Sequence, residues 1–232
     1  VLGERVMSQF GLGVPQLLLP GAAFAGALVA TLAVWRIATR SGQTSVALLL
    51  LAGIATNAIA NAGVGVLTFM ADDTQLRTLT FWAMGSIAHA NWADIRMLAP
   101  WMIALTIAVP WLARPLNAML LGEAVAGHLG FPAHRIKQAA VLVSALAVGA
   151  AVALTGLIGF VGLVAPHIVR LAGGVDHRWL LPASALLGAT LLIAADTLAR
   201  VIVAPAELPI GLVTALIGGP FFLLLLMRQR IP

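Results

Sequence analysis

The chain has 232 residues, of which 61% are hydrophobic and only 9% are charged, and it contains no cysteine. Soluble domains carry about 25% charged residues, so this composition excludes a soluble domain and predicts a polytopic membrane protein. The lack of cysteine excludes a disulfide or a thiolate metal site, and the net charge of +5 fits basic cytoplasmic loops better than binding to nucleic acid.

Long runs without a charged residue give the expected membrane crossings. A helix needs about 20 apolar residues to cross a bilayer core of roughly 30 Å. Six runs meet this need: 17–35, 46–71, 97–113, 138–166, 179–195 and 208–227. We therefore expect an all-α fold, a helical bundle in a lipid bilayer. Because the chain begins with Val1 and has no signal-peptide layout, we also expect the N-terminal part of the natural protein to be missing.

The run 138–166 is too long for one crossing, and its end is rich in residues that stop helices. These residues are Gly156, Gly159, Gly162 and Pro166. Irregular backbone is tolerated at membrane depth only where it is buried in protein or lines a wet cavity. We therefore expect a crossing that is broken at Gly159, Gly162, Pro166 and His167, followed by a short seventh crossing at 163–173.

The distribution of basic side chains favours this broken crossing. With seven crossings, nine of the 13 basic residues fall on one side of the membrane; with six, the split is seven to six. The nine are Arg36, Arg40, Arg114, Arg135, Lys137, Arg170, Arg178, Arg228 and Arg230, and the other four are Arg5, Arg77, Arg96 and Arg200. Because cytoplasmic loops carry the excess of Lys and Arg, this pattern places the C-terminus in the cytoplasm.

Two connections are longer than simple turns. The external segment 72–96 mixes charges with Phe81, Trp82 and Trp92, which predicts a short interfacial helix with an aromatic anchor. The cytoplasmic segment 114–137 has room for two short helices, separated at Gly130-Phe131-Pro132.

Asp196 and Arg200 are four residues apart near the outer end of the sixth run, so they share one helix face. They form either a neutralising pair near lipid or a site where Arg200 docks an acidic external partner, and the two interpretations are compatible. His167 is a candidate for a proton relay, but a relay needs a chain of ionisable groups, and the preceding runs offer only Asn57 and Asn61. We favour packing, or a hydrogen bond to broken backbone, for His167. The two asparagines either bond between helices or line a polar path.

Catalytic patterns are missing from the sequence. It has no paired carboxylates, no Ser/His/Asp arrangement, no His-Glu-x-x-His motif and no phosphate-binding loop. We expect no catalytic residue, no metal site and no ATP hydrolysis by the chain itself.

Several blocks, in the right order, resemble a known family. They are "FWAMGS" (81–86), "RPLNAMLLGEAVAGHLG" (114–130), "LTGLIGFVGLVAPHIVRLAGGVDHRWLLP" (154–182) and "ADTLARVIVAPAELPIGLVTALIGGPFF" (195–222). On these blocks the chain resembles a FecCD-type permease, the membrane subunit of ABC importers for iron-siderophores, haem and vitamin B12.

The resemblance implies the fold and the partners. It implies a single permease domain over 1–232, of the type II ABC importer kind, with ten helices in the family and so about three N-terminal helices absent here. It further implies a homodimer, or a pair of homologous halves, in the bacterial inner membrane, with two ABC ATPase subunits beneath it and a periplasmic substrate-binding protein above it. It also implies that the permease binds no permanent cofactor and that ATP is used by the partner subunit.

The resemblance also implies roles for individual residues. The 114–137 loop would couple to the ATPase, through residues Leu121, Gly122, Glu123, Ala124, Gly127 and Gly130. Arg200 would meet a glutamate of the binding protein, the 72–92 segment would flank the outer gate, and Thr44 and Ser45 would lie near the cytoplasmic gate.

The expected substrate rests on the resemblance of one short motif. "LTFWAMGS" (79–86) is similar to haem-importer permeases, which implies haem or another iron complex, with vitamin B12 as the alternative. A competing hypothesis from another class is a proton-coupled secondary transporter or channel, with Asp196 and His167 as its ionisable core. Transport without any ATPase would favour that alternative.

Overall fold

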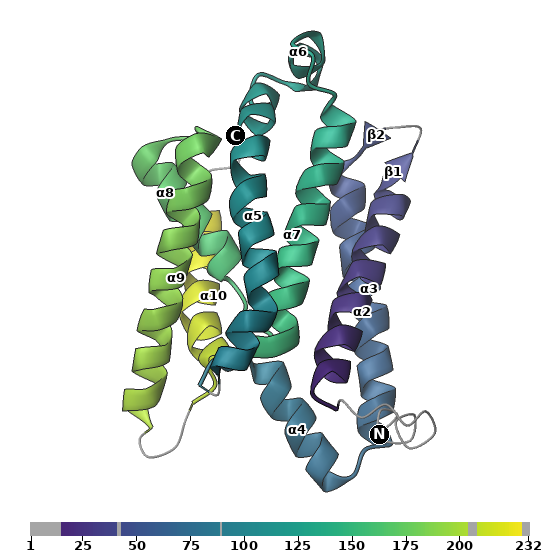
Figure 1. Cartoon of the computed structure of the whole chain (residues 1–232), viewed down its shortest axis with the longest axis vertical. Coiled ribbons are helices and arrows are strands. Elements are labelled where there is room, and N and C mark those ends of the chain that lie inside the picture. Colours follow the sequence, from purple (N-terminus) through teal and green to yellow (C-terminus); the bar gives the residue numbers. More distant parts are fainter. Residues whose placement is uncertain (1–14, 41–42, 89, 204–207, 229–232) are drawn as a thin grey trace.

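The computed structural model describes residues 15–40, 43–88, 90–203 and 208–228, and these form a helical bundle (Figure 1). The helices are α2 (Pro15–Ala38), α3 (Val46–Phe69), α4 (Asp73–Met84), α5 (Trp92–Met119), α6 (Glu123–His128), α7 (Ala133–Thr155), α8 (Val161–Gly173), α9 (His177–Ile202) and α10 (Ile210–Arg228). Two antiparallel strands of two residues each, β1 (Thr39–Arg40) and β2 (Gln43–Thr44), lie between α2 and α3. The predicted all-α class is confirmed.

Five of the described helices are long and apolar enough to cross a membrane: α2, α3, α5, α7 and α9. Two shorter apolar helices, Val161–Gly173 and Ile210–Leu225, span only about 20 and 24 Å at 1.5 Å per residue. The predicted count of seven crossings includes these two, and it stays a prediction.

The described helices pack through small side chains. Alanine dominates the buried residues: Ala38, Ala52, Ala113, Ala118, Ala126, Ala150, Ala153, Ala165, Ala195 and Ala199. Large apolar side chains such as Ile103, Ile107 and Ile193 point outward instead. This arrangement is typical of helices in lipid, where the tails solvate leucine and small residues let the backbones approach closely.

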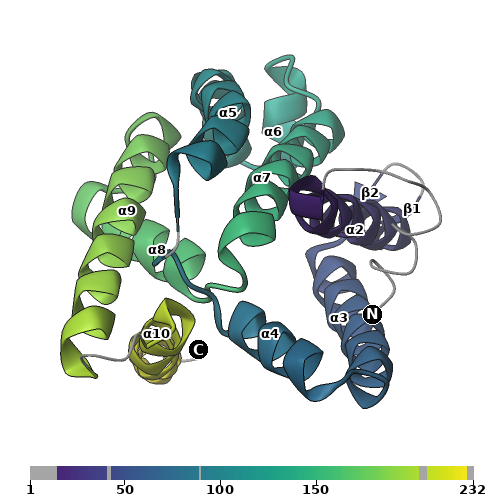
Figure 2. The ribbon, with the colours of Figure 1, turned by 60° about the horizontal axis from the view of Figure 1, so that its bottom comes forward.

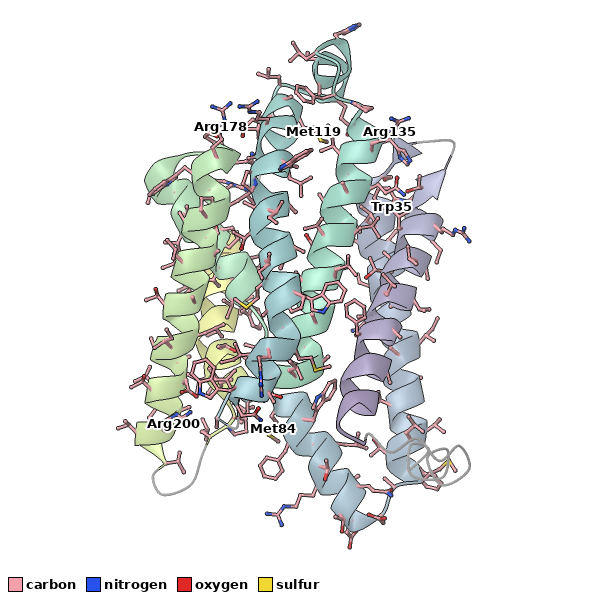
Figure 3. All side chains as sticks on the ribbon, in the orientation of Figure 1. Trp35, Met84, Met119, Arg135, Arg178 and Arg200 are labelled. Carbon is pink, nitrogen blue, oxygen red and sulfur yellow. The ribbon has the colours of Figure 1, made fainter. Side chains whose placement is uncertain are left out.

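The two ends of the bundle differ in their connections. The β1–β2 hairpin, α6 and the turn from α8 to α9 lie at one end, here called the α6 end, and α4 lies at the other, the α4 end (Figure 1). Figure 3 shows Arg135 and Arg178 at the α6 end and Arg200 at the α4 end. The connections predicted to share one side therefore do share one end. Arg5 and Arg230 lie outside the described residues.

The break between α7 and α8 covers residues 156–160 and begins earlier than the sequence suggested. Gly159 lies in the break, but Gly162, Pro166 and His167 lie inside α8, so the prediction of irregular backbone at these three residues is wrong. Pro166 removes only one backbone hydrogen bond, the one that the Gly162 carbonyl would accept. Burial of side chains on both sides of the proline, at Ala165 and Val169, keeps the helix intact.

The segment 114–137 holds one separate short helix and not two. α5 continues to Met119 in spite of Pro115, and α7 begins at Ala133, so only α6 stands alone. The predicted separation at Gly130-Phe131-Pro132 is correct, since a turn lies there between α6 and α7. The short helix predicted within 72–96 is also present, as α4. A reciprocal capping box starts it, with the Gln75 N–H donating to Asp72 Oδ1 at 2.8 Å and the Asp72 N–H to Gln75 Oε1 at 3.3 Å.

Candidate functional site

The α6 segment stands beyond the main bundle (Figure 1) and is fixed at its base. Gly122 precedes the helix with φ of 100°. Glu123, in the first turn, forms an ion pair with Lys137 of α7 (Oε1 to Nζ, 2.5 Å). The Phe131 N–H donates to the Ala126 carbonyl at 2.9 Å, and Ala126 is fully buried. These contacts hold α6 against the start of α7.

Apolar side chains on and beside α6 are exposed. Leu121 is 64% exposed, Val125 44% and Leu129 56%. The residues Ala124 and Gly127, also predicted for this site, lie on the helix itself and are exposed. Exposed apolar patches of this kind occur where a protein contacts another protein or a membrane. We name Leu121, Val125 and Leu129 the α6 patch.

A polar network at the same end joins α5 to α9. The Asn117 amide nitrogen donates to Asp176 Oδ1 at 2.5 Å, and its oxygen accepts from the His177 N–H at 2.8 Å. Nδ1 of His177 also lies 2.8 Å from Asn117 Oδ1. Asp176 in turn caps α9 by accepting from the Arg178 N–H at 2.9 Å. The sequence reasoning missed this network, because its partners are 59 and 60 residues apart.

The hydrogen bonds stabilise the charged form of Asp176. The Arg178 backbone N–H and then the Asn117 amide, both donating to this carboxylate, hold the pKa of Asp176 below its usual value. The carboxylate is therefore ionised at neutral pH and serves as a strong cap for the positive N-terminus of α9.

The two proposed gate residues lie beside the hairpin at the α6 end. Thr44 pairs with Thr39 in the hairpin, and its side chain lies outside the described part. Ser45 caps α3, and its Oγ accepts from the Leu48 N–H at 3.5 Å. The visible role of Ser45 is thus to start a helix, and a gating role for either residue stays a prediction.

At the α4 end, Arg200 and Asp196 are paired as their spacing predicts. The Arg200 Nε donates to Asp196 Oδ2 at 2.8 Å. About half of the Arg200 side chain is exposed (49%), against 21% of the Asp196 side chain. The neighbouring Ala195 and Ala199 are buried in a cluster with α10, which turns the ion pair away from the core. Arg200 therefore keeps accessible surface at the α4 end of the bundle.

Three backbone segments meet where α7 breaks (Figure 2). The Ser86 N–H donates to the Thr155 carbonyl at 2.8 Å. A Cβ on Gly156, whose φ is 72°, would lie 2.1 Å from the Trp82 carbonyl oxygen, and a Cβ on Gly211 would lie 2.0 Å from the Met84 oxygen. The end of α4, the break and the start of α10 thus pack backbone against backbone. In the sequence, only the glycines within "FWAMGS" and "LTGLIGF" point to this close backbone packing.

His167 and Phe160 follow this junction and contact α10. The His167 ring meets Phe221 edge-on, with 6.4 Å between the centroids. Phe160 has φ of 65°, a rare value for a residue with a side chain, and a Cβ on Gly218 would lie 2.3 Å from the Phe160 Cβ. These contacts fit the packing role expected for His167.

A cavity of about 1220 Å³ lies between α5 and α9, and its ionisable side chains are Arg114, His177 and Arg178. Within the described residues, no cluster of three or more His, Cys, Asp or Glu side chains has the arrangement of a metal site.

Comparison with known proteins identifies the family. Residues 2–228 match the FecCD transport family. The hemin transport system permease protein HmuU of Yersinia pestis is 48% identical over 99% of this chain and 69% of its own length. The vitamin B12 import system permease protein BtuC of Escherichia coli O9:H4 (strain HS) is 41% identical over 99% of this chain and 68% of its own length.

Two further relatives extend this result. The cobalamin import system permease protein BtuC of Halobacterium salinarum is 42% identical over 90% of this chain and 56% of its own length. A solved structure described as an inward-facing metal-chelate type ABC transporter has a TM-score of 0.75 and 28% identity, over 98% of this chain and 80% of that one. The chain thus spans between 56% and 69% of the length of these curated relatives. It belongs to the FecCD transport family.

Proposed function

We propose that this chain belongs to the permease subunit of an ATP-driven ABC importer. The importer moves haem, or another iron complex, from the periplasm into the cytoplasm. The observation that carries the proposal is the 48% identity to a hemin permease over 99% of the chain. The chain itself acts as a transport subunit, and a partner subunit hydrolyses ATP.

The α6 end faces the cytoplasm in this proposal. Arg135 and Arg178 lie at this end and Arg200 at the other (Figure 3). Lys137 pairs with Glu123 of α6, and Arg77 belongs to α4 at the opposite end. An excess of basic residues is typical of the cytoplasmic side. The membrane is then the bacterial inner membrane, and the C-terminus is cytoplasmic.

The α6 patch is the proposed contact with the ATPase. It is apolar, exposed and held to α7 by the Glu123–Lys137 ion pair, so movement of a bound ATPase would displace α6 together with the start of α7. Rigid-body displacement of helices is a known way to convert such movement into a change of access.

At the opposite end, Arg200 is the proposed contact with the substrate-binding protein. A half-exposed guanidinium beside a well-buried alanine pair suits an acidic side chain on a docking partner. Charge pairs of this kind set the association rate and the orientation of a complex.

A second copy of the permease is the proposed neighbour of α3. This helix packs mainly against α2, and Asn57 and Asn61 on it are exposed. Amides within the membrane need hydrogen-bond partners, which a second copy or a polar path at the dimer axis would supply.

Vitamin B12 is the second candidate substrate, since two BtuC proteins are 41% and 42% identical to the chain. The test reconstitutes the full-length permease and its ATPase in nanodiscs, and records ATP hydrolysis as the cognate binding protein is added. The protein is added empty, or loaded with haem, ferric siderophore or cobalamin.

The expected result is stimulation by the binding protein and accumulation of haem inside sealed vesicles that carry the same complex. Accumulation of cobalamin alone would select the second candidate. Uptake that follows a proton gradient and ignores the ATPase would contradict the proposal and favour a secondary transporter.

A further inference from the structure

The Asn117 side chain is the polar bridge between the end of α5, which leads into α6, and the start of α9. It lies in the last turn of α5, and only residues 118–122 separate it from the start of α6. Its amide holds both residues at the start of α9, by donating to Asp176 and accepting from His177. A displacement of α6 that moves the end of α5 therefore pulls on the first turn of α9.

α9 offers a continuous path from this bridge to the other end of the bundle. It runs without a break from His177 to Ile202, 26 residues, or about 39 Å at 1.5 Å per residue. Its last turns hold the Asp196–Arg200 pair. Pro182 lies within its second turn, close to the bridge, and leaves the rest of the helix regular.

The alternative path through α7 is interrupted. The Glu123–Lys137 pair joins α6 to α7, but α7 ends at Thr155, where the chain enters the non-helical break at residues 156–160. α7 therefore has no direct helical connection to Arg200, whereas α9 contains that residue.

We propose that Asn117 is a positioning residue that couples movement of α6 to α9, and so links the ATPase contact to the Asp196–Arg200 pair near the other end of α9. This inference rests on the proposed function, because it assumes that the ATPase binds at α6 and the binding protein at Arg200. Asn117 touches neither partner; it acts through Asp176 and His177.

The test measures coupling in both directions. The full-length permease, a hydrolysis-deficient ATPase and the binding protein are assembled in nanodiscs. One titration gives the factor by which saturating ATP changes the Kd of the binding protein, and the other gives the factor by which the binding protein changes the Kd of ATP. Linkage requires the two factors to be equal.

In Asn117→Ala we expect both factors to fall by the same amount, at least threefold, while the Kd of the binding protein without ATP stays within twofold of wild type. The matched control is Gln138→Ala. Gln138 is an exposed amide in α7 at the same end, and the described residues give it no hydrogen bond. Its coupling factors should equal those of wild type.

Two further variants protect the test. If Asn117→Ala fails to assemble, Asn117→Asp keeps the size of the side chain but sets a carboxylate against Asp176, and it should show the same loss of coupling. Asp176→Asn keeps an oxygen that accepts from Asn117 and from the Arg178 N–H, and it should retain coupling within twofold.

Wild-type coupling factors in Asn117→Ala or Asn117→Asp would overturn the inference, and so would a lowered melting temperature with unchanged coupling, which shows a purely structural role. If ATP and the binding protein affect each other's Kd equally in wild type and in these variants, the inference fails but the proposed function stays intact. A wild-type complex with no mutual effect of ATP and binding protein contradicts the proposed function, and the inference falls with it.

Discussion

Gly156 lies so close to Trp82 that a Cβ atom on residue 156 would stand 2.1 Å from the Trp82 carbonyl oxygen. The backbone of Gly156 has φ of 72° and ψ of −166°, a region that is essentially reserved for glycine. The contact joins the end of α4 to the break after α7. The backbone conformation of Gly156 and the nearby Trp82 carbonyl both exclude a side chain at residue 156.

Gly156→Ala is therefore expected to destabilise the protein. The backbone conformation alone costs about 1–3 kcal/mol, and the clash with Trp82 adds to it. Thermal unfolding of the purified protein in detergent measures the effect. The control is Gly63→Ala on α3, where a Cβ meets nothing within 4 Å; an equal loss in both variants would contradict a specific junction.

The α6 patch gives a prediction about the ATPase. Leu121→Asp should weaken binding of the ATPase, because burying a leucine side chain contributes about 1.5–3 kcal/mol, or roughly 10- to 100-fold in Kd. Gln138→Asp adds the same charge at the same end outside the patch. Binding of labelled ATPase to permease in nanodiscs compares the two, and equal affinities would mean that the ATPase does not contact Leu121.

Arg200 is expected to govern docking of the binding protein. Arg200→Glu reverses a half-exposed charge, so the association rate should fall about tenfold or more at low salt and lose much of its salt dependence. Asp196→Asn separates docking from pairing, since it removes the acidic partner and keeps Arg200. We expect normal association in Asp196→Asn and slow association in Arg200→Glu. The measurement is the association rate of the binding protein with immobilised permease at several ionic strengths.

The carboxylate of Asp176 predicts an acid-sensitive step in stability. Its pKa in the folded protein is lowered below the ordinary value of 3.8, so the stability that it contributes is present above the unfolded pKa. That contribution is lost as the pH falls through the folded pKa. Asp176→Asn should flatten the fall of the melting temperature below about pH 4, where the ordinary aspartate titrates.

Melting curves between pH 6 and pH 3 compare Asp176→Asn with Asp73→Asn, a change at an exposed carboxylate in the first turn of α4. A profile of Asp176→Asn that matches wild type down to pH 3 would show that this cap contributes nothing.

The features that the sequence predicts well are those written in local patterns. Charge-free runs and the positions of arginines give the helices and the two ends, and a spacing of four residues gives the Asp196–Arg200 pair. The segment 72–96 contains its own helix start, at Asp72 and Gln75. Each of these depends on residues close together in the chain.

The features that it predicts poorly depend on contacts between distant segments. Glycines at 156, 159 and 162 look equivalent in the sequence, and only the approach of Trp82 selects Gly156 as the start of the break. Asn117 has no local pattern that points to Asp176, 59 residues away. Pro166 was expected to stop a helix, but burial of Ala165 and Val169 outweighs it.

The exposed asparagines of α3 also bear on how the protein matures. A helix that packs mainly against one neighbour, with Asn57 and Asn61 on its open face, is costly to leave facing lipid. Newly inserted chains would carry this cost until a partner covers α3. An unassembled subunit should then be a better substrate for membrane proteases than the complete transporter, and the supply of partners would set its lifetime in the cell.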